Sequence, residues 1–166
     1  MSEPKPKTPG LWLEQIGPLV AGLVVLALLL WFSDFFAGKF AAKEWTSSGL
    51  YSAVFGWSAI QTGFAFGVYG FIIGKQDGFV HALRGTAMFE RFESYIKRAN
   101  WGGLALTFPC IPLIVTDPNI AEPLSTAYVI VAIWFAGFVW AFLAFCRLAY
   151  NFGAIASVRD KEFHGA

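Results

Sequence analysis

The sequence predicts an all-α polytopic membrane protein, in which residues 1–166 form a single membrane domain. Four transmembrane helices are expected, with an amphipathic cytoplasmic segment between the second and the third. The first reason is composition: 57% of the residues are hydrophobic and 14% are charged, whereas soluble domains average about 25% charged residues. The second is that long uncharged runs alternate with short polar stretches. The third is the uneven distribution of lysine and arginine between the two sides of the membrane that four spans would define.

The first span is expected at residues 16–36. Residues 16–33 carry no charge, and a helix of that length reaches about 27 Å, close to the thickness of the hydrocarbon core. Trp12 and Trp31 lie near its two ends, where tryptophan is enriched in membrane proteins. The polar residues 37–48 then predict a short interfacial turn.

The second span is expected at residues 50–74, a stretch without charge. On a helical wheel its glycines fall on one face, within an arc of roughly 60°. Glycine is costly inside a soluble helix, but in a bilayer a face of small residues lets a second backbone approach closely. We therefore interpret this face as a helix-packing groove. Its glycines are Gly49, Gly56, Gly63, Gly67, Gly70 and Gly74.

Residues 75–98 form the most polar region and have two amphipathic halves. Phe79 and Leu83 belong to one apolar face, and the apolar face of the second half points roughly the opposite way. The change predicts a break near Gly85, with the segment lying along the membrane surface or docking a cytoplasmic partner. The apolar residues of the second half are Met88, Phe89, Phe92 and Tyr95.

The third and fourth spans are expected at residues 99–116 and 126–150. Pro109 and Pro112 remove two backbone donors within one turn, so the third helix either kinks or ends there. The fourth span carries a second small-residue face, which would suit the glycine groove of the second span. That face consists of Gly137, Ala141 and Ala144.

Four spans place both termini on one side of the membrane. If that side is the cytoplasm, ten lysines and arginines lie inside and only Lys39 and Lys43 lie outside. This bias is the positive-inside pattern. The sequence thus predicts an integral membrane protein with cytoplasmic termini, with the bacterial inner membrane as the default location.

Signals for chemistry are sparse. The chain has no nucleophile-elbow, zincin, P-loop or dinucleotide-binding motif. Its two histidines, His81 and His164, lie outside the predicted spans, away from where a membrane haem would need axial ligands. A net charge of +1 gives no basis for nucleic-acid binding. We therefore expect no enzyme activity, no metal and no cofactor.

The second span contains four uncharged polar residues that would lie within the membrane and could carry a function there: Ser58, Gln61, Thr62 and Tyr69. Three of them, Ser58, Gln61 and Tyr69, lie opposite the glycines on the wheel. They either line a water-filled path or form hydrogen bonds between helices, and the second interpretation is favoured.

Strong packing signals without chemical motifs lead to three functional expectations. The first is a non-catalytic membrane subunit or anchor that assembles with itself or with partner subunits through the glycine face, among membrane lipids. The second is an oligomeric channel or membrane-perturbing effector, similar in outline to small four-helix effectors of bacterial defence systems. The third is an accessory subunit of a photosynthetic or respiratory complex.

Overall fold

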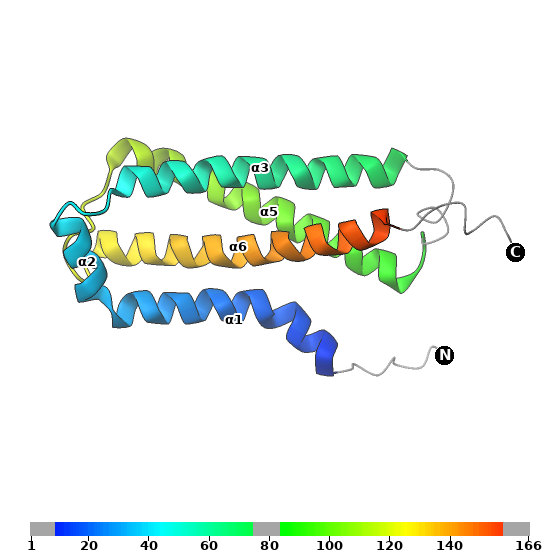
Figure 1. The fold of residues 1–166 in the computed structure, drawn as a ribbon, viewed down its shortest axis with the longest axis horizontal. Coiled ribbons are helices and arrows are strands. Elements are labelled where there is room, and N and C mark those ends of the chain that lie inside the picture. Colours follow the sequence, from blue (N-terminus) through cyan, green and yellow to red (C-terminus); the bar gives the residue numbers. More distant parts are fainter. Residues whose placement is uncertain (1–8, 75–83, 158–166) are drawn as a thin grey trace, which may run out of the picture.

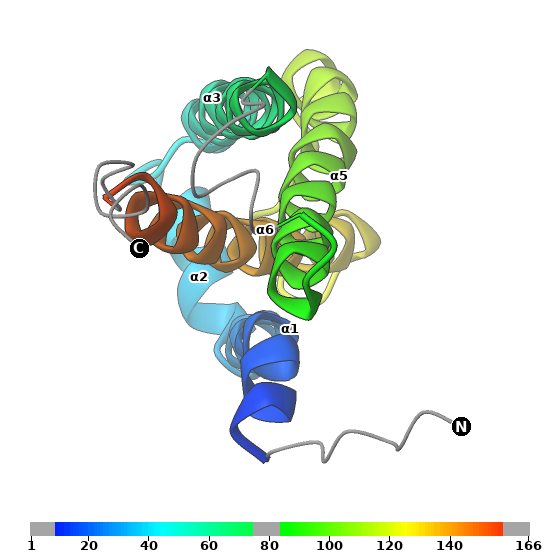
Figure 2. The same ribbon diagram turned by 90° about the vertical axis from the view of Figure 1, so that its right-hand side faces the viewer.

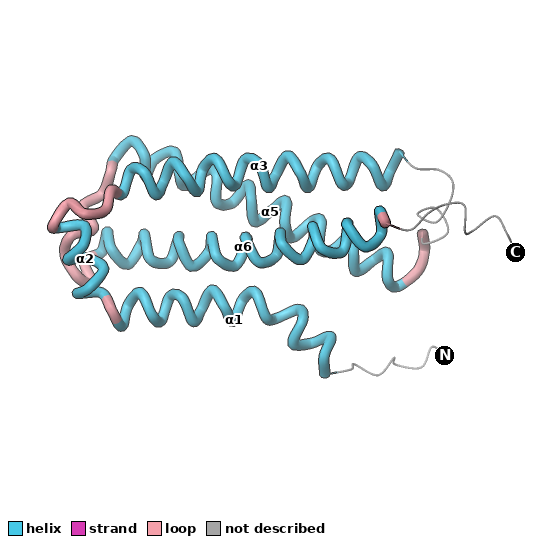
Figure 3. Tube along the Cα trace, viewed as in Figure 1, coloured by secondary structure: helices cyan, strands magenta, loops and turns pink. Residues whose placement is uncertain are grey.

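The computed structural model describes residues 9–74 and 84–157, with only the backbone described for residues 9–15. These residues form five helices (Figures 1 and 3): α1 (Pro9–Trp31), α2 (Ser33–Ala41), α3 (Ser47–Gly74), α5 (Ala87–Thr116) and α6 (Thr126–Ala156). The described part of the chain contains no strand, which confirms the all-α class.

The four long helices run in alternating directions along one bundle (Figure 1). α6 packs against α1 on one side and α5 on the other, and α5 packs against α3 (Figure 2). α2 lies across one end, beside the loops that precede α3 and α6; we call this the α2 end. The start of α1, the end of α3, the start of α5 and the end of α6 lie at the opposite end, which we call the terminal end.

Within the described residues, α5 and α6 are each long and apolar enough to cross a membrane. The pair Ile16–Trp31 and Ser33–Ala41 makes a third crossing if it counts as one broken span. α3 has 28 residues, which is ample length, but its hydropathy falls short of the value that qualifies α5 and α6. Membrane crossing is therefore supported directly for two helices, and the full set of four spans remains a proposal.

The first expected span is one continuous apolar run in the sequence, but in the structure it is divided between two helices. The helix breaks at Phe32, and α2 turns away from α1 by 69°. Part of the polar stretch expected as a turn is thus helical, because α2 extends to Ala41. The bend lets Ser33 and Ala37 become buried over the end of the bundle. Hydropathy along the chain does not reveal this burial, because it depends on tertiary packing.

Gly85 lies in a turn with a φ of +83°, directly before the start of the second expected helical piece, whereas the first piece lies outside the described residues. Thr86 then caps α5, accepting a hydrogen bond from the backbone N–H of Phe89 at 3.3 Å. From Ala87 the helix continues without interruption to Thr116, so residues 87–98 belong to the same helix as the third expected span. Residues 75–83, with Phe79, Leu83 and His81, lie outside the described residues, as does His164.

The second amphipathic half was expected to face a membrane surface or a partner, but Phe92 and Ile96 are buried. They pack in one cluster with Val68 and Ile72 of α3 and Leu148 of α6. The apolar stripe therefore completes the core of the terminal end, which is why this surface is not available for docking. Phe89 packs against the same cluster, Tyr95 is half-buried, and Met88 remains exposed.

The two prolines of α5 do not end the helix, which continues past Pro109 and Pro112 to Thr116. Side chains add hydrogen bonds to the surrounding turns: the hydroxyl of Thr107 donates to the Gly103 carbonyl at 2.9 Å, and the thiol of Cys110 to the Leu106 carbonyl at 3.0 Å. The fourth helix starts as expected, capped by Ser125, and ends six residues later than expected, at Ala156.

Candidate functional site

The face of α3 that packs against α5 carries three of the four polar residues that the sequence singled out. Ser58 and Gln61 are fully buried. The side-chain amide of Gln61 donates to the carbonyl of Ala99 on α5 at 2.8 Å. Ser58 donates to the Val54 carbonyl at 2.8 Å, and Thr62 donates to the Ser58 carbonyl at 2.9 Å. Hydrogen bonding within and between helices therefore accounts for three of the four candidates.

Tyr69, the fourth candidate, lies in different surroundings. It is 40% exposed and borders a hollow of about 230 Å³ near the terminal end, together with Arg84 and Glu93. Tyr69 thus does not continue the buried polar stripe that Ser58 and Gln61 form.

The glycine face of α3 points away from the other helices. A Cβ added at Gly56, Gly63, Gly67, Gly70 or Gly74 would meet no other atom within 4 Å. Gly49 differs, because its Cβ would lie 2.8 Å from Thr46 Oγ1 in the preceding turn. No described part of the chain therefore fills the space over these five glycines.

Other glycines provide the close approaches inside the bundle. A Cβ at Gly103 of α5 would overlap Thr62 Oγ1 and lie 3.3 Å from the Ser58 carbonyl oxygen. A Cβ at Gly22 of α1 would lie 3.0 Å from the Ala136 carbonyl oxygen on α6. The sequence analysis did not single out these positions, although the pair at 102 and 103, the sole glycines of α5, was a usable signal.

The small-residue face of α6 packs against α5 and not against the α3 glycines. Ala141 Cβ lies 3.1 Å from a Cβ added at Gly102, and the nearest neighbour of Gly137 is the Leu106 side chain at 3.9 Å. Ala144 borders a small hollow between α1, α5 and α6. The suggested match between these residues and the glycine groove is therefore not present within the chain.

Aromatic side chains join α3 to α6. Trp57 contacts Phe142 and Phe145, with ring centroids 5.2 and 5.5 Å apart. Further along, Phe64 and Phe71 each pack edge-on against Phe152, at 5.9 and 5.7 Å. Such pairs add about 0.5–1.5 kcal/mol each beyond area burial. Part of the aromatic content thus forms an internal seam, which the spacing of seven residues between Trp57, Phe64 and Phe71 could have indicated.

A cavity of about 580 Å³ lies at the α2 end. Its walls come from the end of α1, from α2, from the first turn of α3 and from the start of α6, and they include Leu29, Phe36, Leu50, Val131 and Phe135. Its size falls within the range of about 300–1,000 Å³ typical of small-molecule sites.

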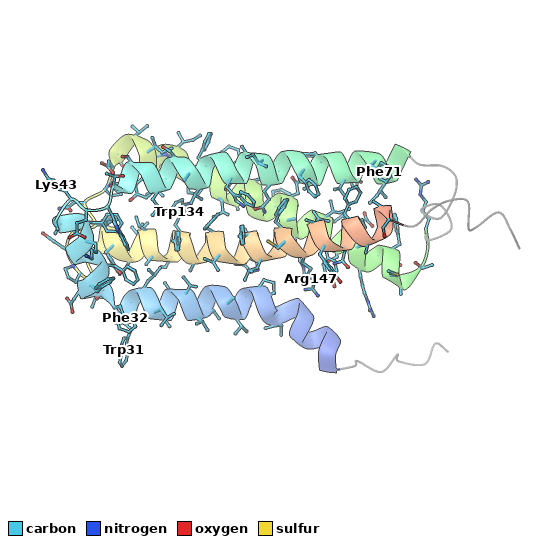
Figure 4. The ribbon with its side chains drawn as sticks, viewed as in Figure 1. Trp31, Phe32, Lys43, Phe71, Trp134 and Arg147 are labelled. Carbon is cyan, nitrogen blue, oxygen red and sulfur yellow. The ribbon has the colours of Figure 1, made fainter. Side chains whose placement is uncertain are left out.

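The terminal end carries several charged residues. Arg147 of α6 stacks on Tyr95 of α5, with its guanidinium carbon 4.4 Å from the ring centroid (labelled in Figure 4). Lys97 forms a salt bridge with Glu93 at 2.9 Å. Within the described residues no group of three or more histidine, cysteine or acidic side chains is placed to hold a metal ion.

The chain was compared with protein-family models, with curated proteins and with solved structures, and none of the three comparisons finds a match.

Proposed function

We propose that the protein is a non-catalytic integral membrane subunit that assembles with further copies or with partner subunits through the glycine face of α3. The observation that supports this is the contrast between the two sides of α3. One side is buried against α5, whereas the five open glycines of the other have no neighbour within 4 Å. Gly63/Gly67 and Gly70/Gly74 are each spaced for the close helix crossing that small residues permit in bilayers.

The proposed topology has four spans, α1 to α2, α3, α5 and α6, and cytoplasmic termini in a bacterial inner membrane. The terminal end would face the cytoplasm. It carries Arg84 in the turn before α5, Arg91, Lys97 and Arg98 in α5, and Arg147 in α6. Lys39 and Lys43 lie at the α2 end. This distribution supports the orientation by the positive-inside rule.

The test is the native mass of the protein after gentle extraction with its lipids. We expect the wild type to form an oligomer or a complex of fixed ratio, and Gly63→Leu combined with Gly67→Leu to yield a folded monomer. The matched control is Ala105→Leu combined with Val115→Leu, which adds leucine to an exposed face of α5. Assembly that survives the glycine changes, or is lost equally in the control, would contradict the proposal.

The channel or effector function is the second candidate, and the contacts of Gln61 and Ser58 do not favour it. Both side chains are enclosed between α3 and α5, so a polar path along them would require those helices to separate. Ion flux through liposomes that depends on Gln61 would support this candidate. Co-purification with pigment-bearing or electron-transfer subunits at a fixed ratio would instead identify an accessory subunit.

A further inference from the structure

The cavity at the α2 end exists because α1 and α3 stand apart and α2 covers the space between them. α1 and α3 both lie beside α6 (Figure 2), and the 69° bend places α2 across their ends. Trp45 holds α2 in this position, with its ring 6.1 Å from Phe36 and 5.7 Å from Phe40. The result is a chamber of about 580 Å³ whose walls are mainly apolar, with Glu44, Thr46 and Tyr128 as the polar residues of the lining.

A second hollow, of about 390 Å³, adjoins this chamber; apolar atoms still form the larger part of its lining, but its polar share is greater than that of the chamber, and we call it the polar hollow. Phe40, Trp45, Thr46 and Ile120 line both. The second hollow also has the side chains of Lys43, Ser47, Asp117 and Asn119. The Ser47 hydroxyl donates to Asp117 Oδ1 at 2.6 Å, which fixes the loop after α5 to the start of α3.

The two hollows lie at different depths along the bundle. The loops of the polar hollow lie at the end of the bundle, where Figure 4 labels Lys43. The apolar chamber continues along α6 as far as Phe135, nine residues from the helix start, which corresponds to about 13 Å. Trp45 lines both regions, and tryptophan is enriched at membrane interfaces.

From this arrangement we propose that the α2 end binds one zwitterionic phospholipid, with a hydrocarbon chain in the apolar chamber and the head group in the polar hollow. Lys43 would lie beside the phosphate and Asp117 beside the ammonium group, so both charges of the head group meet an opposite charge. A hydrocarbon without a head group would leave the polar hollow unused. The proposal depends on a membrane location, and it does not depend on assembly through the glycine face.

The first test is lipid retention, measured by native mass spectrometry of the detergent-solubilised full chain with dioleoylphosphatidylethanolamine. Ala132 is buried and lines the chamber, so Ala132→Phe should fill it. Ala105 is exposed on α5, and Ala105→Phe is the matched control. We expect one tightly held lipid on the wild type and the control, and at least tenfold weaker retention by Ala132→Phe. Equal retention by all three, or none by the wild type, would overturn the proposal.

A second test does not require filling the core. Phosphatidylethanolamine with brominated chains quenches nearby tryptophan, and we expect quenching of the wild type to fall in Trp45→Phe. The head-group site is tested by combining Lys43→Asn with Asp117→Asn, which removes both charges. Asparagine is chosen because it tolerates the positive φ angles of these residues, 57° and 37°. We expect this variant to bind phosphatidylethanolamine at least fivefold more weakly and dioleoylglycerol unchanged. Equal binding of the two lipids by the wild type would overturn the assignment of the head-group site.

Discussion

Gln61 donates its side-chain amide to the carbonyl of Ala99 at 2.8 Å, and this hydrogen bond joins the middle of α3 to α5. Both residues are fully buried. The other amide atom, Oε1, has no partner in the structure, so both of its acceptor positions are unused. The most polar side chain in α3 thus serves helix packing.

Two replacements of Gln61 distinguish the contribution of its hydrogen bond to stability from the contribution of its packing volume. Gln61→Leu keeps most of the volume and should cost roughly 0.6 kcal/mol, the average for an interhelical hydrogen bond in membranes. Gln61→Ala also leaves a cavity and should cost about 2 kcal/mol or more. Unfolding in mixed micelles with increasing dodecyl sulfate measures both. Equal losses for the two variants would show that the hydrogen bond, not the packing, dominates.

Which residues share each face of α3 could be predicted from the sequence alone. A single helical wheel places Gln61 and Ser58 opposite the glycines, and the structure buries the first set and exposes the second. This assignment succeeds because the 3.6-residue period fixes which residues share a face. It needs no knowledge of the other helices.

The partner of each face could not be assigned in the same way. The exposure of the α3 glycines depends on Gly103 occupying the contact with Ser58 and Thr62, an approach between residues more than 40 positions apart. The cavity likewise depends on the bend at Phe32, since hydropathy treats the residues on both sides of it as one run. Long-range packing decides these features, and local patterns do not encode it.

Gly103 should be among the least tolerant positions of the bundle. In Gly103→Ala the new methyl group would overlap Thr62 Oγ1 and press on the Ser58 backbone, and such overpacking costs about 1–3 kcal/mol. Removing the obstacle with Thr62→Ala should restore part of the loss. The control is Gly153→Ala on α6, where an added Cβ has no neighbour within 4 Å; we expect it to leave unfolding unchanged or to stabilise by about 0.4–1 kcal/mol. A neutral Gly103→Ala would contradict this tight contact.

Arg84 should determine how firmly the last turn of α3 is held. Its guanidinium donates to the carbonyls of Ile72 and Ile73 at 2.8 and 3.0 Å, where an arginine also complements the negative end of the helix dipole. In Arg84→Ala we expect hydrogen exchange at the amides of residues 71–74 to accelerate about tenfold, because charged hydrogen bonds contribute about 1.5–3 kcal/mol. Arg91→Ala, on an exposed position of α5, is the control and should leave these amides unchanged. Exchange at the wild-type rate in Arg84→Ala would mean that packing alone closes the helix.

Cysteine labelling in intact cells tests whether α3 crosses the membrane. Ser48 lies in the first turn of α3, Glu122 in the loop before α6, and Glu90 in the first turn of α5; all three are exposed. If α3 crosses, a membrane-impermeant maleimide should label Ser48→Cys and Glu122→Cys from outside, and Glu90→Cys only after permeabilisation. The wild type is the background control, because its two cysteines, buried Cys110 and exposed Cys146, lie within the proposed spans. Labelling of Ser48→Cys and Glu90→Cys from the same side would show that α3 does not cross. α5 and α6 would then be left to anchor the protein, and the glycine face would have to meet its partner outside the bilayer.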